Sequence, residues 1–242
     1  MGKKKKEVSG LTETVLEIGV KPLSYRVNLK CKNQKQKELV NNIKANQITV
    51  VEGVFGVGKT FVINSVALEM LKNQEVEKII LIVPSVSNGS MSLGHLPGSL
   101  DEKIYNFAVN ELESFRKILQ KYGNENADQI IEELFKKEMI QIRPLAFLRG
   151  ASFENAFICV SEAEQFTKED LFLILTRFES GKMVISGDQL QTDRKEVKSG
   201  NSGLQHAMER LNGINGVGIV KFSENDIVRN DILLDIYNKW KN

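Results

Sequence analysis

The chain is poor in the residues that form covalent crosslinks and metal centres. Its 242 residues include two cysteines and two histidines. Cys31 and Cys159 lie far apart, and Cys159 falls within an apolar run, so neither a disulfide framework nor a zinc site is indicated. His95 and His206 are isolated from each other and from any cysteine pair. We therefore expect two reduced thiols and two structural or surface histidines.

Long apolar runs and an excess of one charge are also missing. No stretch of about 18 apolar residues occurs, and the basic N-terminus is followed by polar sequence instead of an apolar signal core. We expect a cytoplasmic protein with no membrane partner. The formal net charge is +2, so composition by itself favours no nucleic-acid partner. The lysine run at residues 3–6 is either a solvated tail or an arm that touches phosphates.

The spacing of apolar residues predicts one principal α/β domain. We interpret residues 1–32 as a basic N-terminal extension with one strand near residues 23–29, and residues 33–242 as the domain. Apolar runs predict strands at residues 48–51, 79–83, 140–142, 156–160, 183–185 and 217–222. Helical spacing is found at residues 34–46, after the 53–60 segment to about residue 73, and at 168–178, 203–211 and 226–240. Two more helices, at residues 101–122 and 128–137, belong to an insertion of about residues 85–138. Strands that alternate with helices indicate a parallel sheet covered on both faces.

Residues 53–60 carry the most specific motif. They follow a β-branched run and fit the pattern G-x-x-x-x-G-K-[ST] of a phosphate-binding loop. Glycines let backbone N–H groups surround phosphates, and the N-terminus of the following helix adds partial positive charge. We expect Lys59 to reach the β and γ phosphates and Thr60 to place its hydroxyl on Mg²⁺. The predicted nucleotide-binding residues of this segment are Gly53, Val54, Phe55, Gly56, Val57, Gly58, Lys59, Thr60 and Phe61.

The strand at residues 156–160 is the best candidate for the acidic half of the site. Phosphoryl transfer needs acid groups near Mg²⁺ and near the attacking water. The usual aspartate at the strand end is replaced by Ser161, whose hydroxyl can hydrogen-bond a metal-bound water but brings no charge. Glu162 is the predicted group that orients or deprotonates water. In the alternative interpretation, Glu162 and Glu164 are acids at the start of a helix.

The strand at residues 183–185 leads to polar residues at the same sheet edge. Ligands of open α/β sheets bind at this edge. Gln191 suits a sensor of the γ-phosphate, because an amide can accept from water and donate to phosphate; alternatively, Gly187 and Asp188 form a turn that only closes the strand. The T-K-x-D pattern at residues 167–170 is better explained as a helix N-cap than as a guanine-reading motif, so adenine is favoured.

Taken together, these residues resemble the PhoH-like family, ATPases related to superfamily 1 helicases but with one RecA-like core. The shared stretches occur in family order at residues 53–60, 93–98, 144–150, 161–163, 187–191, 202–204 and 226–229. The resemblance implies a P-loop fold, hydrolysis of ATP with Mg²⁺ and a helicase-like activity. It also implies single-stranded RNA or related nucleic acid as partner, and ring-like homo-oligomers such as hexamers. Gln36 is similar to the glutamine that contacts adenine in such proteins.

The resemblance further implies that Arg229 stabilises the transferred charge, with Arg177 as a second candidate. A single RecA-like core lacks the domain that normally supplies this group, so we expect a neighbouring subunit to supply it. The chain departs from the family pattern at Ser161, at Val83 and at Glu164, where an aspartate, a basic residue and a glutamine are expected. The alternative function is therefore a nucleotide-gated binding or assembly protein with weak or no hydrolysis.

A nucleic-acid surface is indicated by arginines that flank an apolar stretch. Arg143 and Arg149 enclose a segment that contains Phe147. In one interpretation the arginines contact phosphates and Phe147 stacks on a base. In the other, Phe147 belongs to the core.

Overall fold

The computed structural model describes residues 24–84, 100–192, 200–230 and 232–241. Its centre is a six-stranded sheet in the order β3-β2-β4-β5-β1-β6, and all neighbouring strands are parallel. The strands are β1 (Ile48–Glu52), β2 (Lys78–Val83), β3 (Ile140–Pro144), β4 (Ala156–Val160), β5 (Gly181–Gly187) and β6 (Val217–Lys221). Each corresponds to an apolar run of the sequence. One strand, β5, separates β1 from β4, so the segments that follow these two strands face each other across its end.

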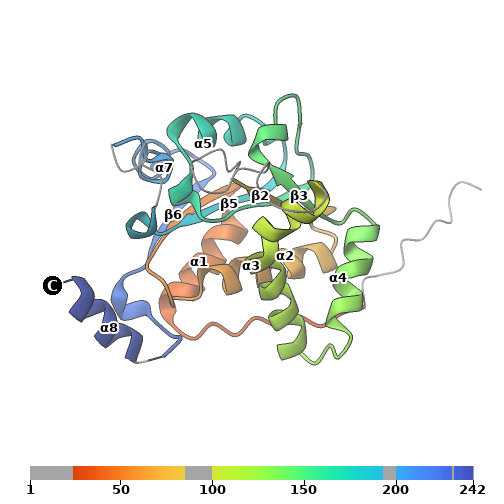
Figure 1. The fold of residues 1–242 in the computed structure, drawn as a ribbon, viewed down its shortest axis with the longest axis horizontal. Coiled ribbons are helices and arrows are strands. Elements are labelled where there is room, and N and C mark those ends of the chain that lie inside the picture. The colour runs from red at the N-terminus through yellow and green to blue at the C-terminus, as the bar shows by residue number, and fades with distance from the viewer. Residues whose placement is uncertain (1–23, 85–99, 193–199, 231, 242) are drawn as a thin grey trace, which may run out of the picture.

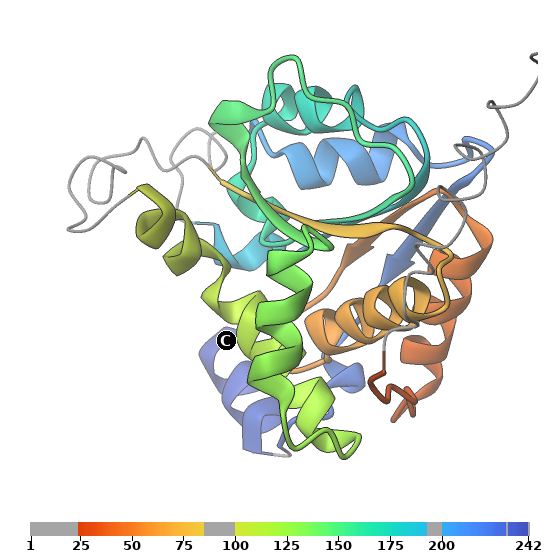
Figure 2. The ribbon, with the colours of Figure 1, turned by 90° about the vertical axis from the view of Figure 1, so that its right-hand side faces the viewer.

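Helices cover both faces of the sheet (Figures 1 and 2). One face carries α1 (Gln34–Ala45), α2 (Lys59–Lys72), α3 (Leu100–Lys121) and α4 (Ala127–Lys136), and the other carries α5 (Lys168–Leu175) and α7 (Gly203–Arg210). Strand β2 shows the alternation that this requires, because Ile79 and Leu81 belong to one apolar cluster and Ile80 and Ile82 to the other. The predicted class, α/β with a RecA-like parallel sheet and a helical insertion, is confirmed.

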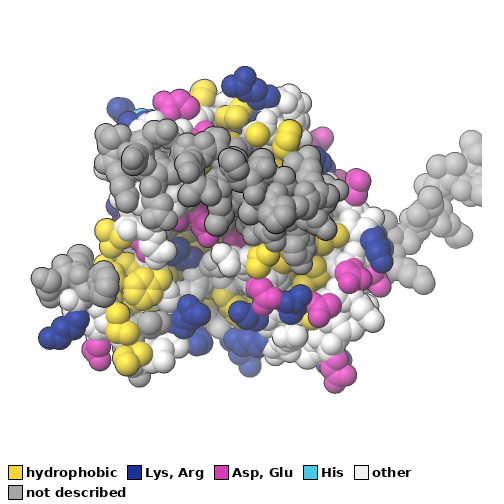
Figure 3. Space-filling view, in the orientation of Figure 1, with side chains coloured by type: hydrophobic (Ala, Val, Ile, Leu, Met, Phe, Trp, Pro, Cys, Tyr) yellow, Lys and Arg dark blue, Asp and Glu magenta, His cyan; other side chains and the backbone are white. Residues whose placement is uncertain are grey.

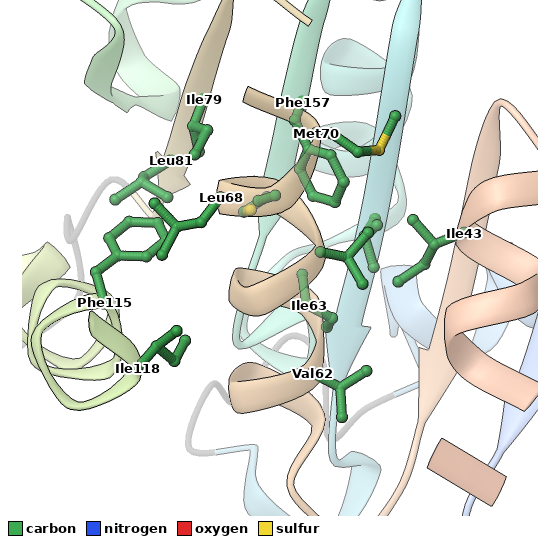
Figure 4. Close-up of a cluster of buried hydrophobic side chains, with 14 of the residues drawn as sticks. Ile43, Val62, Ile63, Leu68, Met70, Ile79, Leu81, Phe115, Ile118 and Phe157 are labelled. Carbon is green, nitrogen blue, oxygen red and sulfur yellow. The ribbon is translucent and has the colours of Figure 1, made fainter. Parts of the chain in front are cut away.

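The insertion between β2 and β3 packs closely against the sheet-covering helix α2. A stripe on α3 with helical spacing is buried, and Figure 4 shows Phe115 and Ile118 from this stripe facing α2. Both side chains are fully buried in the same apolar cluster as Leu68 of α2. Helix α3 is therefore part of the core, and its position is determined by the helix that begins at the phosphate-binding loop.

The surface has no simple charge pattern on the face drawn in Figure 3, where acidic and basic side chains of the described residues are interspersed.

Among the described residues, no helix combines the length and apolarity needed to cross a membrane. Both cysteines are free, and Cys159 is buried, as expected for reduced thiols. The lysine run at residues 3–6 and the segments at residues 85–99, which include His95, lie outside the described residues.

Two predicted elements differ from the structure. The strand predicted near residues 23–29 is absent from its described part, residues 24–29, because this segment bonds to other groups instead of a neighbouring strand. The Tyr25 hydroxyl donates to the Leu68 carbonyl at 2.8 Å, and the Arg26 N–H donates to Asn124 Oδ1 at 2.9 Å. The last helix, α8 (Ile232–Lys241), begins later than residue 226. A separate 3-10 turn at Glu224–Asp226 precedes it, closed by a capping box with Ser223.

Candidate functional site

A cleft of about 680 Å³ opens where β1, β4 and β5 end. Its walls come from the phosphate-binding loop after β1, from the residues after β4 and β5, from α3 and from the segment after β6. The parallel strands bring these segments together because their carboxyl ends meet at one edge of the sheet. The cleft therefore lies where open parallel α/β sheets bind their ligands.

The loop geometry leaves the first N–H groups of α2 available to a phosphate. Gly58 precedes the helix with φ of 85°, and no side chain caps the helix N-terminus. Glycine is also required at the start of the loop: a Cβ on Gly53 would lie 2.6 Å from Cβ of Phe222. The loop thus combines a left-handed turn with close contact to the segment after β6, and it exposes backbone donors at its end.

Gln36 fastens α1 to the phosphate-binding loop. Its Oε1 accepts from the Lys32 N–H at 2.8 Å, and its Nε2 donates to the Val57 carbonyl at 2.9 Å. The side chain is 4% exposed and lines the cleft. An amide oxygen and an amide NH₂ can each form one more hydrogen bond, so the adenine contact stays a prediction compatible with this position.

The side chain of Lys59 folds back onto the start of the phosphate-binding loop. Its Nζ donates to the Gly53 carbonyl and, at 3.1 Å, to the Val54 carbonyl. Burial lowers the pKa of Lys59, while the carboxylates of Asp188, Glu164 and Glu52 act in the opposite direction. A phosphate oxygen is a stronger acceptor for an ammonium group than a neutral carbonyl, so the predicted phosphate contact needs only a local exchange of partners.

Glu162 adopts a backbone conformation that is rare for a residue with a side chain. Its φ is 53° and its ψ is 44°, directly after β4. Such conformations cost roughly 1–3 kcal/mol and cluster at functional sites. The exposed side chain lines the cleft, where Asn110 Nδ2 donates to Oε1 at 3.5 Å. Glu162 is the N-cap of a short 3-10 helix, Ala163–Gln165, whose first turn contains Glu164, so both acids lie at a helix start as the alternative interpretation has it. Helix α5 begins only at Lys168, capped by Thr167.

Glu164 joins the segment after β4 to the end of β5. It is 5% exposed and accepts the Asp188 N–H at 2.9 Å. Burial raises the pKa of Glu164 to about 7, although the hydrogen bond from Asp188 and the charge of Lys59 lower it and Glu162 raises it. This carboxyl therefore changes its charge near neutral pH, within electrostatic reach of Lys59.

Gln191 follows β5 in a short 3-10 turn at Gln189–Gln191. Asp188 caps the turn, accepting from the Leu190 N–H at 3.1 Å and from Gln191 Nε2 at 2.8 Å. The turn that sequence reasoning offered as the alternative is present, and Gln191 also lines the cleft. Its role as a γ-phosphate sensor stays a prediction.

Arg229 lines the cleft of its own chain, whereas the sequence analysis expected it to act on a neighbour. Two bonds hold its segment there: the Val228 N–H donates to the Gly56 carbonyl at 3.0 Å, and Lys32 Nζ donates to the Val228 carbonyl at 3.1 Å. The arginine is thus attached to its own phosphate-binding loop. Arg177, the second candidate, donates to the Ala151 carbonyl at 3.5 Å outside the cleft lining.

One wall of the cleft, formed by the insertion, is not marked by any motif of the sequence. Residues of α3 that line it are Asn110, Glu111, Ser114, Lys117 and Lys121. Their spacing places them along one side of the helix. One signal was available: Glu111 lies at helical spacing from Ala108 and Phe115 on the apolar stripe, where a charged residue is unusual.

Glu111 is buried beside the strand end that lacks an aspartate. It is 7% exposed, its Oε2 accepts from Asn64 Nδ2 at 2.6 Å, and Ser161 lines the same cleft. Burial raises the pKa of Glu111, the bonds from Ser161 and Asn64 lower it, and Glu162 raises it. Glu111 of α3 and Ser161 after β4 thus line the cleft, and Asn64 of α2 binds Glu111 from the buried interior.

The residues present fit a magnesium ion bound together with a nucleotide. No group of three His, Cys, Asp or Glu that could hold a metal by itself occurs in the described ranges. Magnesium in phosphate-binding sites keeps several waters and takes one or two protein ligands plus phosphate oxygens. Thr60, Ser161 and Glu111 line the cleft and offer two hydroxyls and one carboxylate for this purpose.

A phosphate-binding loop between a parallel strand and a helix, in a RecA-like sheet, defines a P-loop NTPase. A model of the PhoH-like protein family matches residues 28–241. The chain belongs to the PhoH-like family.

Individual relatives agree with this assignment. A PhoH-like protein of Bacillus subtilis is 34% identical over 215 residues, and one of Synechocystis is 31% identical over 214 residues. Both alignments cover 88% of this chain, which spans 64% and 62% of the lengths of the two relatives. Among solved structures, the Hef helicase domain of Pyrococcus furiosus is similar to this chain with a TM-score of 0.45 and 16% sequence identity. The alignment covers 78% of this chain and 37% of the Hef chain.

Proposed function

We propose that the protein is a magnesium-dependent ATPase that couples ATP hydrolysis to binding or remodelling of single-stranded RNA. The observation that carries this proposal is the convergence of Lys59, Thr60 and Glu162 on one cleft at the carboxyl edge of the sheet. The loop and the N-terminus of α2 surround the phosphates, and Lys59 neutralises them. Magnesium, when bound, neutralises charge on the β and γ phosphates.

The remaining site residues have roles in positioning and charge stabilisation. Glu162 orients the attacking water and accepts its proton, since it is exposed to the cleft and held at the end of β4. Gln191 binds the γ-phosphate or the water from the end of β5. Arg229 stabilises the charge that develops during transfer, and in this proposal it acts within its own chain because its segment is bonded to the loop.

The proposed RNA contact lies beyond β3, near the same edge of the sheet. Phe147 is 56% exposed, so the interpretation of this residue as core is wrong. Arg143 and Arg149, both exposed, precede and follow it in the chain. An exposed aromatic ring near basic side chains suits base stacking combined with phosphate contacts.

Steady-state ATPase rates with and without single-stranded RNA test the proposal. Glu162→Gln removes the base but keeps the size of the side chain, and we expect turnover to fall by about 10²–10⁴-fold with ATP binding retained. Glu154→Gln, an exposed acid before β4, is the matched control and should leave the rate unchanged. A robust rate that survives Glu162→Gln would show that the base is assigned wrongly. ATP binding without measurable turnover in the wild type would instead favour the nucleotide-gated binding protein.

A further inference from the structure

One buried acid in the cleft has no counterpart in the sequence motifs. Glu111 belongs to α3, within the insertion, and its side chain lines the wall of the phosphate site. The ion pairs formed within the described ranges do not include Glu111. A buried carboxylate without a cation is unfavourable, and a cation beside it offsets that cost. The position of Glu111 is thus suited to a site that binds a cation.

Glu111 lies near both elements that face the predicted metal. Asn64, which donates to it at 2.6 Å, follows Thr60 by four residues on α2. Residues four apart on a helix lie on the same face, one turn from each other. Ser161, where the usual aspartate is replaced, lines the same cleft, and it lowers the pKa of Glu111. Glu111 therefore lies between the helix face that carries the predicted magnesium ligand and the strand end that lacks its acid.

We propose that Glu111 supplies, from the helical insertion, the carboxylate toward the magnesium of MgATP that β4 lacks at Ser161. The inference rests on the proposed function, because it concerns the metal of the same site. Thr60 and the phosphates would hold the ion, and Glu111 with Ser161 would accept hydrogen bonds from its water ligands. The small serine at the strand end leaves room for this carboxylate, whereas an aspartate there would place two like charges side by side.

A purely structural role is the competing explanation, since Glu111 also links α3 to α2 through Asn64. Glu111→Gln distinguishes the two roles. A glutamine can accept from Asn64 and bond to the serine hydroxyl, so the link between the helices survives while the charge is lost. Glu132→Gln, an exposed acid on α4 of the same insertion, is the matched control.

The experiment measures the affinity of the full chain for a fluorescent ATP analogue, once with excess Mg²⁺ and once with EDTA, together with the unfolding temperature without ligand. In Glu111→Gln we expect unchanged nucleotide affinity in EDTA. The increase in affinity that Mg²⁺ provides, called here the Mg²⁺ gain, should be about 10–100-fold smaller than in the wild type, the size of effect seen when partners of metal ligands are removed. Adding Ser161→Asp to this variant should restore the gain, because it returns the carboxylate to the strand end.

Each outcome decides for or against the role of Glu111. A Mg²⁺ gain that persists in Glu111→Gln, or that the double variant fails to restore, overturns the inference. Ser161→Asp alone tests it without altering Glu111, in case Glu111→Gln does not fold: we expect no increase in the Mg²⁺ gain, and a tenfold increase would show that no carboxylate serves the metal now. If the wild type binds no nucleotide under either condition, the proposed function itself fails.

Discussion

The buried carboxyl of Glu164 makes the stability of this protein depend on pH in a direction opposite to that of most acidic residues. Its pKa in the folded protein is raised to about 7 from an ordinary value of 4.5, mainly by burial. Between these two values the folded protein keeps a proton that the unfolded chain has lost. The contribution of Glu164 to the free energy of unfolding is therefore fully present below pH 4.5 and declines as the pH rises. The decline ends above pH 7, where Glu164 is ionised in the folded protein as well.

The magnitude follows from the size of the pKa difference. One pKa unit corresponds to about 1.4 kcal/mol, so ionising Glu164 in the folded state lowers the free energy of unfolding by about 3 kcal/mol. Glu164→Gln removes the titration, and its amide oxygen can still accept the Asp188 N–H. We expect the variant to match the wild type near pH 4.5 and to be more stable by up to about 3 kcal/mol at pH 8.

Urea unfolding at closely spaced pH values between 4.5 and 8.5 measures this difference directly. Glu154→Gln, in which an exposed acid is neutralised, should follow the wild-type pH dependence throughout. A stability difference between Glu164→Gln and the wild type that does not grow with pH would refute this prediction, because the carboxyl would then have the same pKa in the folded and unfolded states.

Three further predictions concern the loop, the RNA surface and the arginine. Gly53→Ala places a methyl group 2.6 Å from Cβ of Phe222 and should cost about 1–3 kcal/mol in urea unfolding; unchanged stability would contradict this clash. Phe147→Ala should weaken single-stranded RNA binding by about 1–3 kcal/mol per stacked base, measured by fluorescence anisotropy at fixed salt, with the unfolding temperature unchanged. Because Arg229 lines its own cleft, turnover per chain should stay constant on dilution, whereas a rate that falls with concentration would indicate an arginine from a neighbour.

Local patterns in the sequence predicted most of the fold because the elements are strongly periodic. The continuous apolar runs at β2 and β4 are typical of strands buried on both faces, and both strands are present where these runs occur. The strand predicted near residues 23–29 is absent from residues 24–29 for a physical reason. Its apolar residues are spaced like a strand, but Tyr25 is buried through a bond to the backbone of α2, a contact that no local pattern encodes.

Some features of the site could likewise be predicted from local sequence, and others depend on tertiary packing. The phosphate-binding loop could be predicted from local sequence, since its glycines, lysine and threonine lie at set spacing within eight consecutive residues between a strand and a helix. Which acids face that loop depends on how distant parts of the chain pack together. Glu111 lies 50 residues before Ser161 in the chain, and packing of α3 on α2 places both residues in the lining of one cleft. The attachment of the Arg229 segment to its own loop likewise depends on a bond between Val228 and Gly56, which lie far apart in the sequence and close together in the fold.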